Sequence, residues 1–259
     1  MFTERDLSES VEAVRDRHAP DALVLDVDRD FETLPPAQAE ELGLVVDALD
    51  PVTYPTAWLP PGTPEPLIEY AGAEFTVGMP GDGGVAWTRQ TEPPVVLYKP
   101  RLDGSPESFV DFLLAEALVE VGLDEPEHFL GFFADQYVEF ADVTREVLEP
   151  AGTYQLAAAC YDAYLGLQTR DVFAGWEGPL FEAWVDAGER LEPRLADLAG
   201  VIARGERTFP EAAELACNAV KHAVEIPPPF DALDSAVYLE HGPSFAVEWA
   251  DRVADTLDI

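Results

Sequence analysis

Lysine is almost missing from this chain. Lys99 and Lys221 are the only two, and all basic residues together number 15 against 51 Asp and Glu, which gives a formal net charge of -36. The chain has no basic run and no alternation of Arg with aromatic residues that could neutralise phosphate groups. The sequence therefore argues against direct binding of nucleic acid.

Long apolar runs and cysteine pairs are missing as well. No segment approaches 18 consecutive uncharged apolar residues, and the first ten residues, MFTERDLSES, lack the basic and apolar regions of a secretory signal. We therefore expect a cytoplasmic protein that neither spans nor binds a membrane. Cys160 and Cys217 lie in alanine-rich helical patterns without C-x-x-C spacing, so we predict two buried thiols rather than a disulfide or a metal site.

Hydrophobic residues, in contrast, are plentiful. They make up 47% of the chain, and aromatic residues 10%, which is enough for a sizeable core and too much for a disordered acidic chain. The carboxylates are spread over the whole chain, so we interpret them as an adaptation to molar salt, in which the Debye length falls to roughly 3 Å. An acidic surface that captures a basic partner or mimics nucleic acid is the rival interpretation.

The composition also carries a resemblance. With its few lysines and its acidic, helical C-terminal region, the chain resembles uncharacterised haloarchaeal proteins. The resemblance implies a halophilic, archaeal origin, and it implies no particular activity.

The first 104 residues have mixed patterns that predict a small α+β layer. Pro80–Gly84 reads as a hairpin turn between the first two of three antiparallel strands. The expected helices are Leu7–Arg17 and Pro35–Ala48; the expected strands are Ala22–Val27, Phe75–Met79, Val85–Thr88 and Val95–Tyr98.

Residues 105–259 have a helical period throughout, beginning at Ser105 and Pro106, a cap followed by a proline in the first turn. Short loops between the helices predict an antiparallel bundle or array. The fold class is therefore α+β and predominantly α, with regions 1–104 and 105–259 that either fold separately or pack as one unit. The further expected helices are 126–148, Tyr154–Thr169, Pro179–Arg204 with a break at Pro193, Phe209–Glu225, Ala232–Glu240 and Ser244–Leu257.

Most acidic motifs in so acidic a chain arise by chance. Asp26-Val27-Asp28 after an apolar run resembles the first motif of haloacid dehalogenase phosphatases, but the family's other residues cannot be placed. A calcium loop continuing to Asp30 is excluded, because Phe31 stands where such a loop needs glycine. Glu125 and His128 have the spacing of a di-iron pair without a second such pair. We expect neither a metal nor a cofactor.

The residues that depart from the acidic trend are the better site candidates. Lys99 and Arg101 follow a predicted strand at the boundary between the regions, and Trp176 follows a glycine; these are the candidate binding residues. The candidate catalytic residues are Asp26, Asp28 and His241.

Two functions remain open at this stage. The first is a non-catalytic cytosolic protein, an interaction or regulatory module, whose helical region binds another protein. The alternative is a hydrolase or transferase with an acidic or histidine site in a cleft between the two regions, where Lys99 or Arg101 would hold an anion. The sequence leans toward the non-catalytic function and does not indicate an oligomeric state.

Overall fold

The computed structural model describes residues 1–72, 74–79, 81 and 83–257. It has the predicted α+β, predominantly α, architecture. Two compact units divide the chain: unit 1 holds residues 1–54 and 65–127, and unit 2 holds residues 55–64 and 128–259. The helix that follows Pro106 thus belongs to the unit that contains the sheet, whereas the sequence pattern grouped it with the helical region.

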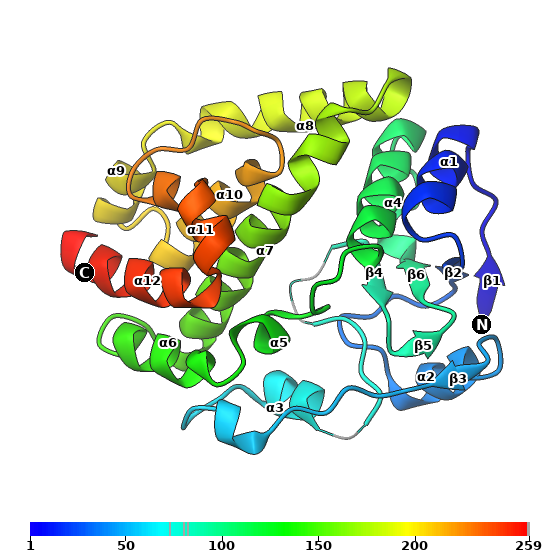
Figure 1. Ribbon diagram of the computed structural model, residues 1–259, viewed down its shortest axis with the longest axis horizontal. Helices are drawn as coiled ribbons and strands as arrows, with labels where there is room; N and C mark the ends of the chain where they lie inside the picture. The colour runs from blue at the N-terminus through cyan, green and yellow to red at the C-terminus, as the bar shows by residue number, and fades with distance from the viewer. Residues whose placement is uncertain (73, 80, 82, 258–259) are drawn as a thin grey trace. The chain divides into compact units, whose positions relative to one another are not determined.

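Unit 1 is built on a four-stranded mixed sheet in the order β1-β2-β6-β4 (Figure 1). Its two central strands, β2 and β6, run parallel, and each outer strand is antiparallel to its neighbour. The sheet therefore differs from the three-stranded antiparallel element that the sequence predicted. The strands are β1 (Phe2–Glu4), β2 (Leu23–Val27), β4 (Val85–Thr88) and β6 (Val95–Tyr98), with a separate pair formed by β3 (Ala48–Leu49) and β5 (Thr91–Glu92).

The strand predicted at Phe75–Met79 was wrong. This segment belongs to no sheet, although the Leu34 N–H donates to the Val77 carbonyl at 2.8 Å and Val77 and Met79 are buried. Its apolar pattern reflects burial against the core rather than strand pairing. Pro80 and Asp82, two residues of the predicted hairpin turn, lie outside the described residues.

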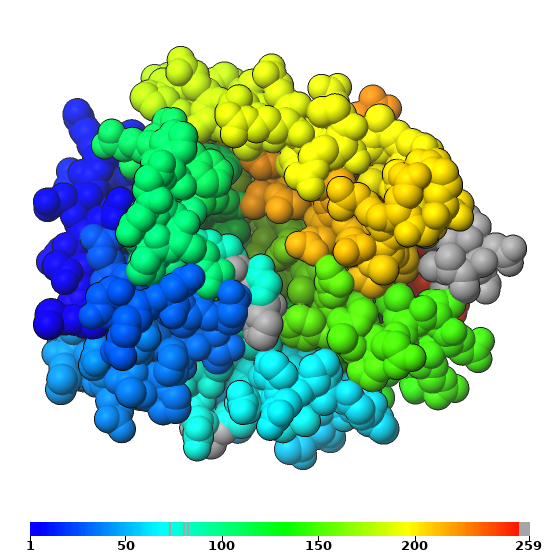
Figure 2. Space-filling model, turned by 180° about the vertical axis from the view of Figure 1, so that it is seen from behind, coloured from blue at the N-terminus to red at the C-terminus, as the bar shows by residue number. Residues whose placement is uncertain are grey.

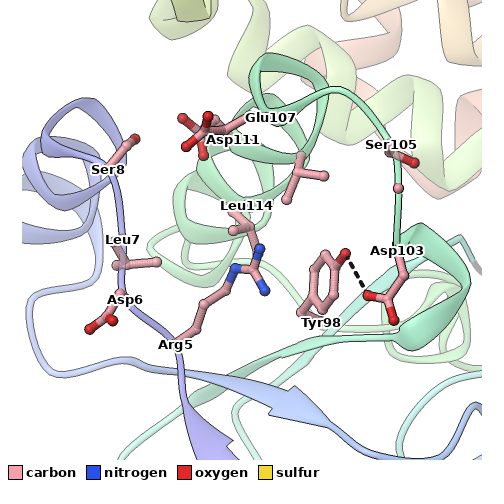
Figure 3. Close-up of a pocket in the computed structure, with 12 residues that line it drawn as sticks. Arg5, Asp6, Leu7, Ser8, Tyr98, Asp103, Ser105, Glu107, Asp111 and Leu114 are labelled. Atoms are coloured by element: carbon pink, nitrogen blue, oxygen red, sulfur yellow. Dashed lines mark hydrogen bonds between the residues drawn. The ribbon is translucent and has the colours of Figure 1, made fainter.

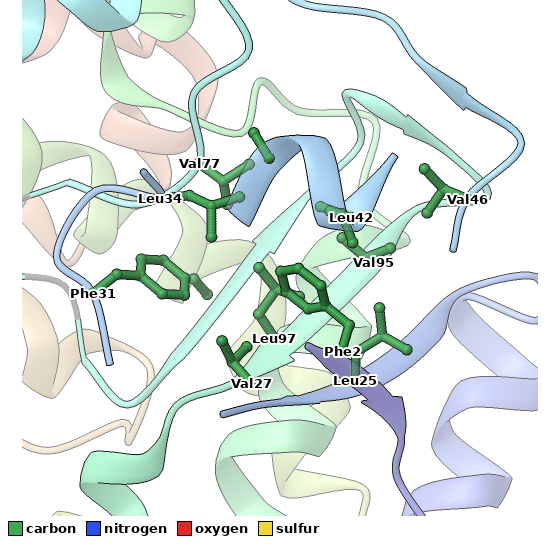
Figure 4. Packing of buried hydrophobic residues seen from close by; sticks show 12 residues of the cluster. Phe2, Leu25, Val27, Phe31, Leu34, Leu42, Val46, Val77, Val95 and Leu97 are labelled. Atoms are coloured by element: carbon green, nitrogen blue, oxygen red, sulfur yellow. The ribbon is translucent and has the colours of Figure 1, made fainter. Parts of the chain in front are cut away.

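Helices cover both faces of this sheet. Helices α1 (Glu9–His18) and α4 (Glu107–Val121) lie side by side on one face, and α2 (Pro36–Leu42) lies on the other, while α3 (Glu65–Ala71) lies beyond the strands (Figure 1). Strand side chains alternate between the faces. Leu25 and Leu97 pack under Leu42 of α2, as Figure 4 shows, so their neighbours Asp26 and Tyr98 point toward α1 and α4.

Unit 2 is a helical array around the 25-residue helix α7. Its helices are α5 (Phe129–Phe133), α6 (Gln136–Thr144), α7 (Pro150–Ala174), α8 (Gly178–Leu195), α9 (Leu198–Ala203), α10 (Phe209–Val220), α11 (Ala236–His241) and α12 (Pro243–Leu257), with 3-10 turns at Thr56–Trp58 and Phe230–Leu233. A third 3-10 turn, Pro100–Leu102, lies in unit 1.

Small residues bring α7 and α10 close together. A Cβ atom on Gly166 would lie 2.9 Å from the Lys221 backbone nitrogen, so only glycine fits there. Cys160 and Cys217 are buried free thiols on these helices, as predicted, and burial raises the pKa of both. Thr208 and Glu211 form a capping box where α10 begins.

Candidate functional site

A pocket of about 340 Å³ lies in unit 1 between the N-terminal ends of α1 and α4 (Figure 3). It also lies at the carboxyl end of the parallel pair β2 and β6, because α4 follows β6 after a short turn and runs back along it. Ligands of α/β sheets commonly bind at this edge. Its volume suits a small molecule.

Arg5 forms one wall of this pocket. Its guanidinium pairs with Asp26 Oδ1 at 2.5 Å and lies over the Tyr98 ring, 3.9 Å from the ring centroid. Asp26 and Tyr98 are directly opposed on the paired strands, so the sheet register fixes both partners of the arginine. Asp26, a candidate catalytic residue, thus takes part in an ion pair at the pocket wall.

The Tyr98 hydroxyl donates a hydrogen bond to Asp103 Oδ1 at 3.2 Å. Burial, and next the bond to Asp103, raise the pKa of Tyr98. The phenol therefore remains protonated at neutral pH and acts as a donor. Figure 3 shows the ring between Arg5 and the turn that carries Asp103.

Carboxylates dominate the rest of the lining. Glu107 and Asp111 are one helical turn apart on α4, and Asp6 and Asp103 lie across from them. Glu107 sits in the first turn of α4, where the partial positive charge of the helix end favours an acid. The carboxylates of the chain thus offset the partial positive charge of the helix end, which would otherwise attract an anion. The pocket therefore favours a cationic or neutral polar molecule.

Lys99 and Arg101 lie on the opposite face of the sheet. Lys99 is fully buried, and its Nζ lies 4.5 Å from the centroid of the Phe31 ring. Arg101 binds Asp30 through Nε at 2.8 and 2.9 Å and Glu32 through a terminal nitrogen at 2.9 Å. The hydrogen bonds from Arg101 lower the pKa of both carboxyl groups, Asp30 and Glu32.

The other three candidates are not among the residues that line the pocket. Asp28 is exposed and pairs with the amino terminus at 2.7 Å. Trp176 and His241 belong to unit 2. Trp176 packs on Phe173 with ring centroids 4.6 Å apart, and His241 is an exposed residue that ends α11. The structure thus brings Lys99 and Arg101 to one face of unit 1 and Asp26 to the other.

Sequence analysis missed a polar cluster around Glu127. One carboxylate oxygen accepts bonds from the Thr88 hydroxyl and the Arg89 N–H, each at 2.8 Å. The other accepts from the Tyr70 hydroxyl at 3.1 Å and from the Gln90 side-chain amide. Three of the donors are the consecutive residues 88–90, but Tyr70 and Glu127 lie far from them in the chain, so no local motif indicates the cluster.

The Leu44 surface, made of Leu44, Val45, Leu49 and Val52, is the second feature that the sequence did not reveal. Leu44 is 87% exposed and Val45 43%, and all four side chains are exposed. The helix predicted to reach Ala48 ends at Leu42, so Leu44 and Val45 lie on a turn, Leu49 lies on β3, and Val52 follows this strand. Figure 2 shows residues 35–50 (medium blue) uncovered on the face turned to the viewer.

Comparisons with known proteins give a family and no activity. Among the described residues every helix is too short or too polar to cross a membrane, and no group of three His, Cys, Asp or Glu side chains is placed to hold a metal ion. No curated protein and no solved structure shows significant similarity to the chain. One family model matches residues 1–257, and the chain therefore belongs to the family of unknown function DUF7089.

Proposed function

We propose that this protein is a non-catalytic interaction module of the cytosol of a halophilic archaeon, and that the Leu44 surface is where it binds another protein. The supporting observation is the exposure of four aliphatic side chains within nine residues, in a chain with 51 Asp and Glu residues. Exposed apolar patches with polar borders are typical of protein-binding sites.

The backbone beneath this surface is held in place. The Leu44 N–H donates to the Glu41 carbonyl at 3.2 Å, and the Val45 N–H donates to the Leu42 carbonyl at 2.9 Å. Leu42 itself is fully buried in the core. A partner would therefore meet apolar side chains on a backbone that is already ordered, which lowers the entropic cost of binding.

The helical unit offers a smaller apolar strip. Val237 is 50% exposed and Leu239 41%, and both belong to the six-residue helix α11. The sequence suggested that the helical region binds the partner, and this strip is where it would do so. We favour the Leu44 surface because it holds twice as many aliphatic side chains and adjoins a sheet edge.

The second candidate function is a hydrolase or transferase, and the pocket between α1 and α4 is the observation in its favour. Tyr98 supplies a protonated donor there, and Glu107 and Asp111 supply carboxylates. Under this alternative the catalytic site lies within unit 1, and Asp26 contributes only by its ion pair with Arg5.

Affinity capture from a native high-salt lysate tests the proposal. We expect a stoichiometric protein partner with the wild type, and a loss of at least about tenfold with Leu44→Ser plus Val45→Ser, because a few apolar anchors carry most of a binding energy. Val237→Ser plus Leu239→Ser is the matched control and should retain the partner. Equal capture by the Leu44 variant, or a clean monomer carrying a metabolite, would overturn the proposal.

A further inference from the structure

The chain passes between the two units three times: after Tyr54, before Glu65 and after Glu127. Residues 55–64, which we call the strap, are therefore an excursion that leaves unit 1 and returns to it. Four of the ten strap residues are prolines, which have no N–H to donate. The 3-10 turn of the strap, Thr56–Trp58, packs on α6 within unit 2. The strap thus belongs to unit 2, whereas both of its ends continue into unit 1.

The two ends of the strap are fastened to each other inside unit 1. The Tyr54 N–H donates to the Ala71 carbonyl at 3.1 Å, and the rings of Tyr54 and Tyr70 stack with their centroids 6.0 Å apart. A hydrogen bond also joins the two tyrosine side chains. Tyr70 and Ala71 end α3, the helix by which the chain re-enters unit 1. The strap is therefore a loop that is closed at its base.

The Glu127 cluster joins this base to the third crossing. The Tyr70 hydroxyl donates to the Glu127 carboxylate at 3.1 Å. A second connection runs through Gln90, whose side-chain oxygen accepts from the Val52 N–H at 3.0 Å and whose side-chain amide donates to the same oxygen of Glu127. Glu127 is itself the last residue before the chain leaves unit 1. One carboxylate thus connects the segments at all three crossings.

These connections are made at the border of unit 1 rather than in its core. Tyr54 and Glu127 are only half-buried, and the bonds that reach Glu127 come mostly from side chains. Val96 and Leu97 of β6, in contrast, are fully buried in a strand that is paired on both sides. Segments with fewer buried apolar contacts open locally at a lower free energy than the core of a domain.

We propose that the Glu127 cluster is a latch on the strap. Closed, the latch holds both ends of the strap and the chain at Glu127 together in unit 1. Open, it releases Tyr54 and the strap while the sheet of unit 1 stays folded. This conformational device goes beyond the proposed function, because it operates whether or not the Leu44 surface binds a partner.

Amide hydrogen exchange of the wild-type protein gives the first test. Two amides report on the latch, namely those of Tyr54, bonded to the Ala71 carbonyl, and Val52, bonded to Gln90. Both should exchange at least about tenfold faster than the amides of Val96 and Leu97, because the latch opens without unfolding the sheet. Equal protection of the reporters and of β6 would overturn the latch, since the strap would then be released only when unit 1 unfolds.

Two tyrosine variants give the second test. Tyr70→Phe keeps the ring and removes the hydroxyl with its bonds to Glu127 and Tyr54. We expect the Tyr54 amide to exchange about tenfold faster in this variant, because a bond to a charged group is lost only from the closed latch. Exchange of the Tyr54 amide at the wild-type rate would overturn the proposal.

Tyr98→Phe is the matched control. Tyr98 is likewise a buried tyrosine of unit 1, and its hydroxyl donates to the Asp103 carboxylate at 3.2 Å. That bond is present in both the closed and the open latch, so the Tyr54 amide should exchange within about twofold of the wild-type rate. An acceleration equal to that in Tyr70→Phe would show that the strap responds to the stability of unit 1 as a whole, and the latch would be wrong.

Discussion

At the scale of single residues, rarity in the sequence pointed to an unusual environment. Lys99 drew attention as one of two lysines, and it proves to be fully buried above the Phe31 ring. Its charge also helps to lower the pKa of Asp30 and Glu32, after the larger effect of Arg101. A buried ammonium needs compensation of this kind. Its role as an anion-binding residue stays a prediction, and its position favours a structural role inside unit 1.

Glu127 holds together a polar cluster of unit 1, so its substitution should destabilise this unit. In Glu127→Gln, the new amide NH2 must face either the Arg89 N–H or the Gln90 side-chain amide, which are both donors. We expect the free energy of unfolding to fall by about 3 kcal/mol, the cost of losing bonds to a charged group and leaving buried donors unsatisfied. Urea denaturation at a fixed salt concentration measures it.

Asp124→Asn is the matched control for this substitution. Asp124 lies three residues earlier and is exposed. Removing its charge should change the free energy of unfolding by no more than about 0.5 kcal/mol. Equal effects of the two substitutions would show that the Glu127 cluster does not stabilise unit 1.

At the scale of elements, the helices and strands that depend on local sequence signals were predicted. Features that depend on contacts between residues far apart in the chain were not. The apolar run before Asp28 is a strand, and the capping signal at Thr208 begins a helix. The single helix expected over 126–148 instead breaks at Ala134, where φ is 52°. Phe129 and Phe133 stay helical on one side of the break, and their aromatic neighbours in the fold, such as Tyr154, were invisible to periodicity.

The site was less predictable than the fold for the same reason. The pocket joins Arg5, Tyr98 and Glu107, which lie in three separate segments of the chain, and neither spacing nor composition relates them. Local motifs built from Asp were background in so acidic a chain. The Leu44 surface could not be predicted from the sequence, because the apolar pattern of residues 42–46 also fits a buried helix. Leu44 and Val45 are exposed because α2 ends at Leu42.

The packing of α1 against α4 gives a prediction at this scale. Both Gly122 and Gly175 end a helix with right-handed backbone angles, but a Cβ atom on Gly122 would lie 2.2 Å from the His18 carbonyl oxygen. Gly122→Ala should therefore lower the free energy of unfolding by about 2 kcal/mol through overpacking. A thermal melt followed by circular dichroism measures it.

Gly175→Ala provides the comparison. Its Cβ atom would meet carbonyl oxygens of its own helix at 3.4 Å, an ordinary contact. This variant should be neutral or more stable by about 0.5 kcal/mol, because alanine restricts the unfolded chain more than glycine does. A loss in Gly175→Ala as large as that in Gly122→Ala would show that the α1–α4 contact is not the cause.

At the scale of the whole molecule, charge repulsion opposes folding. Apart from those of the amino terminus, the ion pairs that the structure describes engage arginines, such as Arg101 with Asp30 and Arg5 with Asp26. The 51 Asp and Glu residues far outnumber the 15 basic residues. The surface therefore carries a large excess of negative charge. The same negative charge disfavours contact between copies of the chain and gives the Leu44 surface its acidic border. Charge thus governs both self-association and the choice of partner.

Salt should stabilise this protein. Between about 0.1 and 1 M KCl the Debye length falls from about 10 to about 3 Å, so repulsion between surface carboxylates is screened. We expect the melting temperature to rise by about 10 °C over this range, equivalent to roughly 3 kcal/mol for a chain of this size. Glu182, Glu189 and Glu192 are exposed on α8, and their joint replacement by Gln should raise the melting temperature at low salt and flatten its salt dependence. A protein most stable in dilute buffer, or a triple variant with an unchanged slope, would show that the carboxylates serve a partner rather than the solvent.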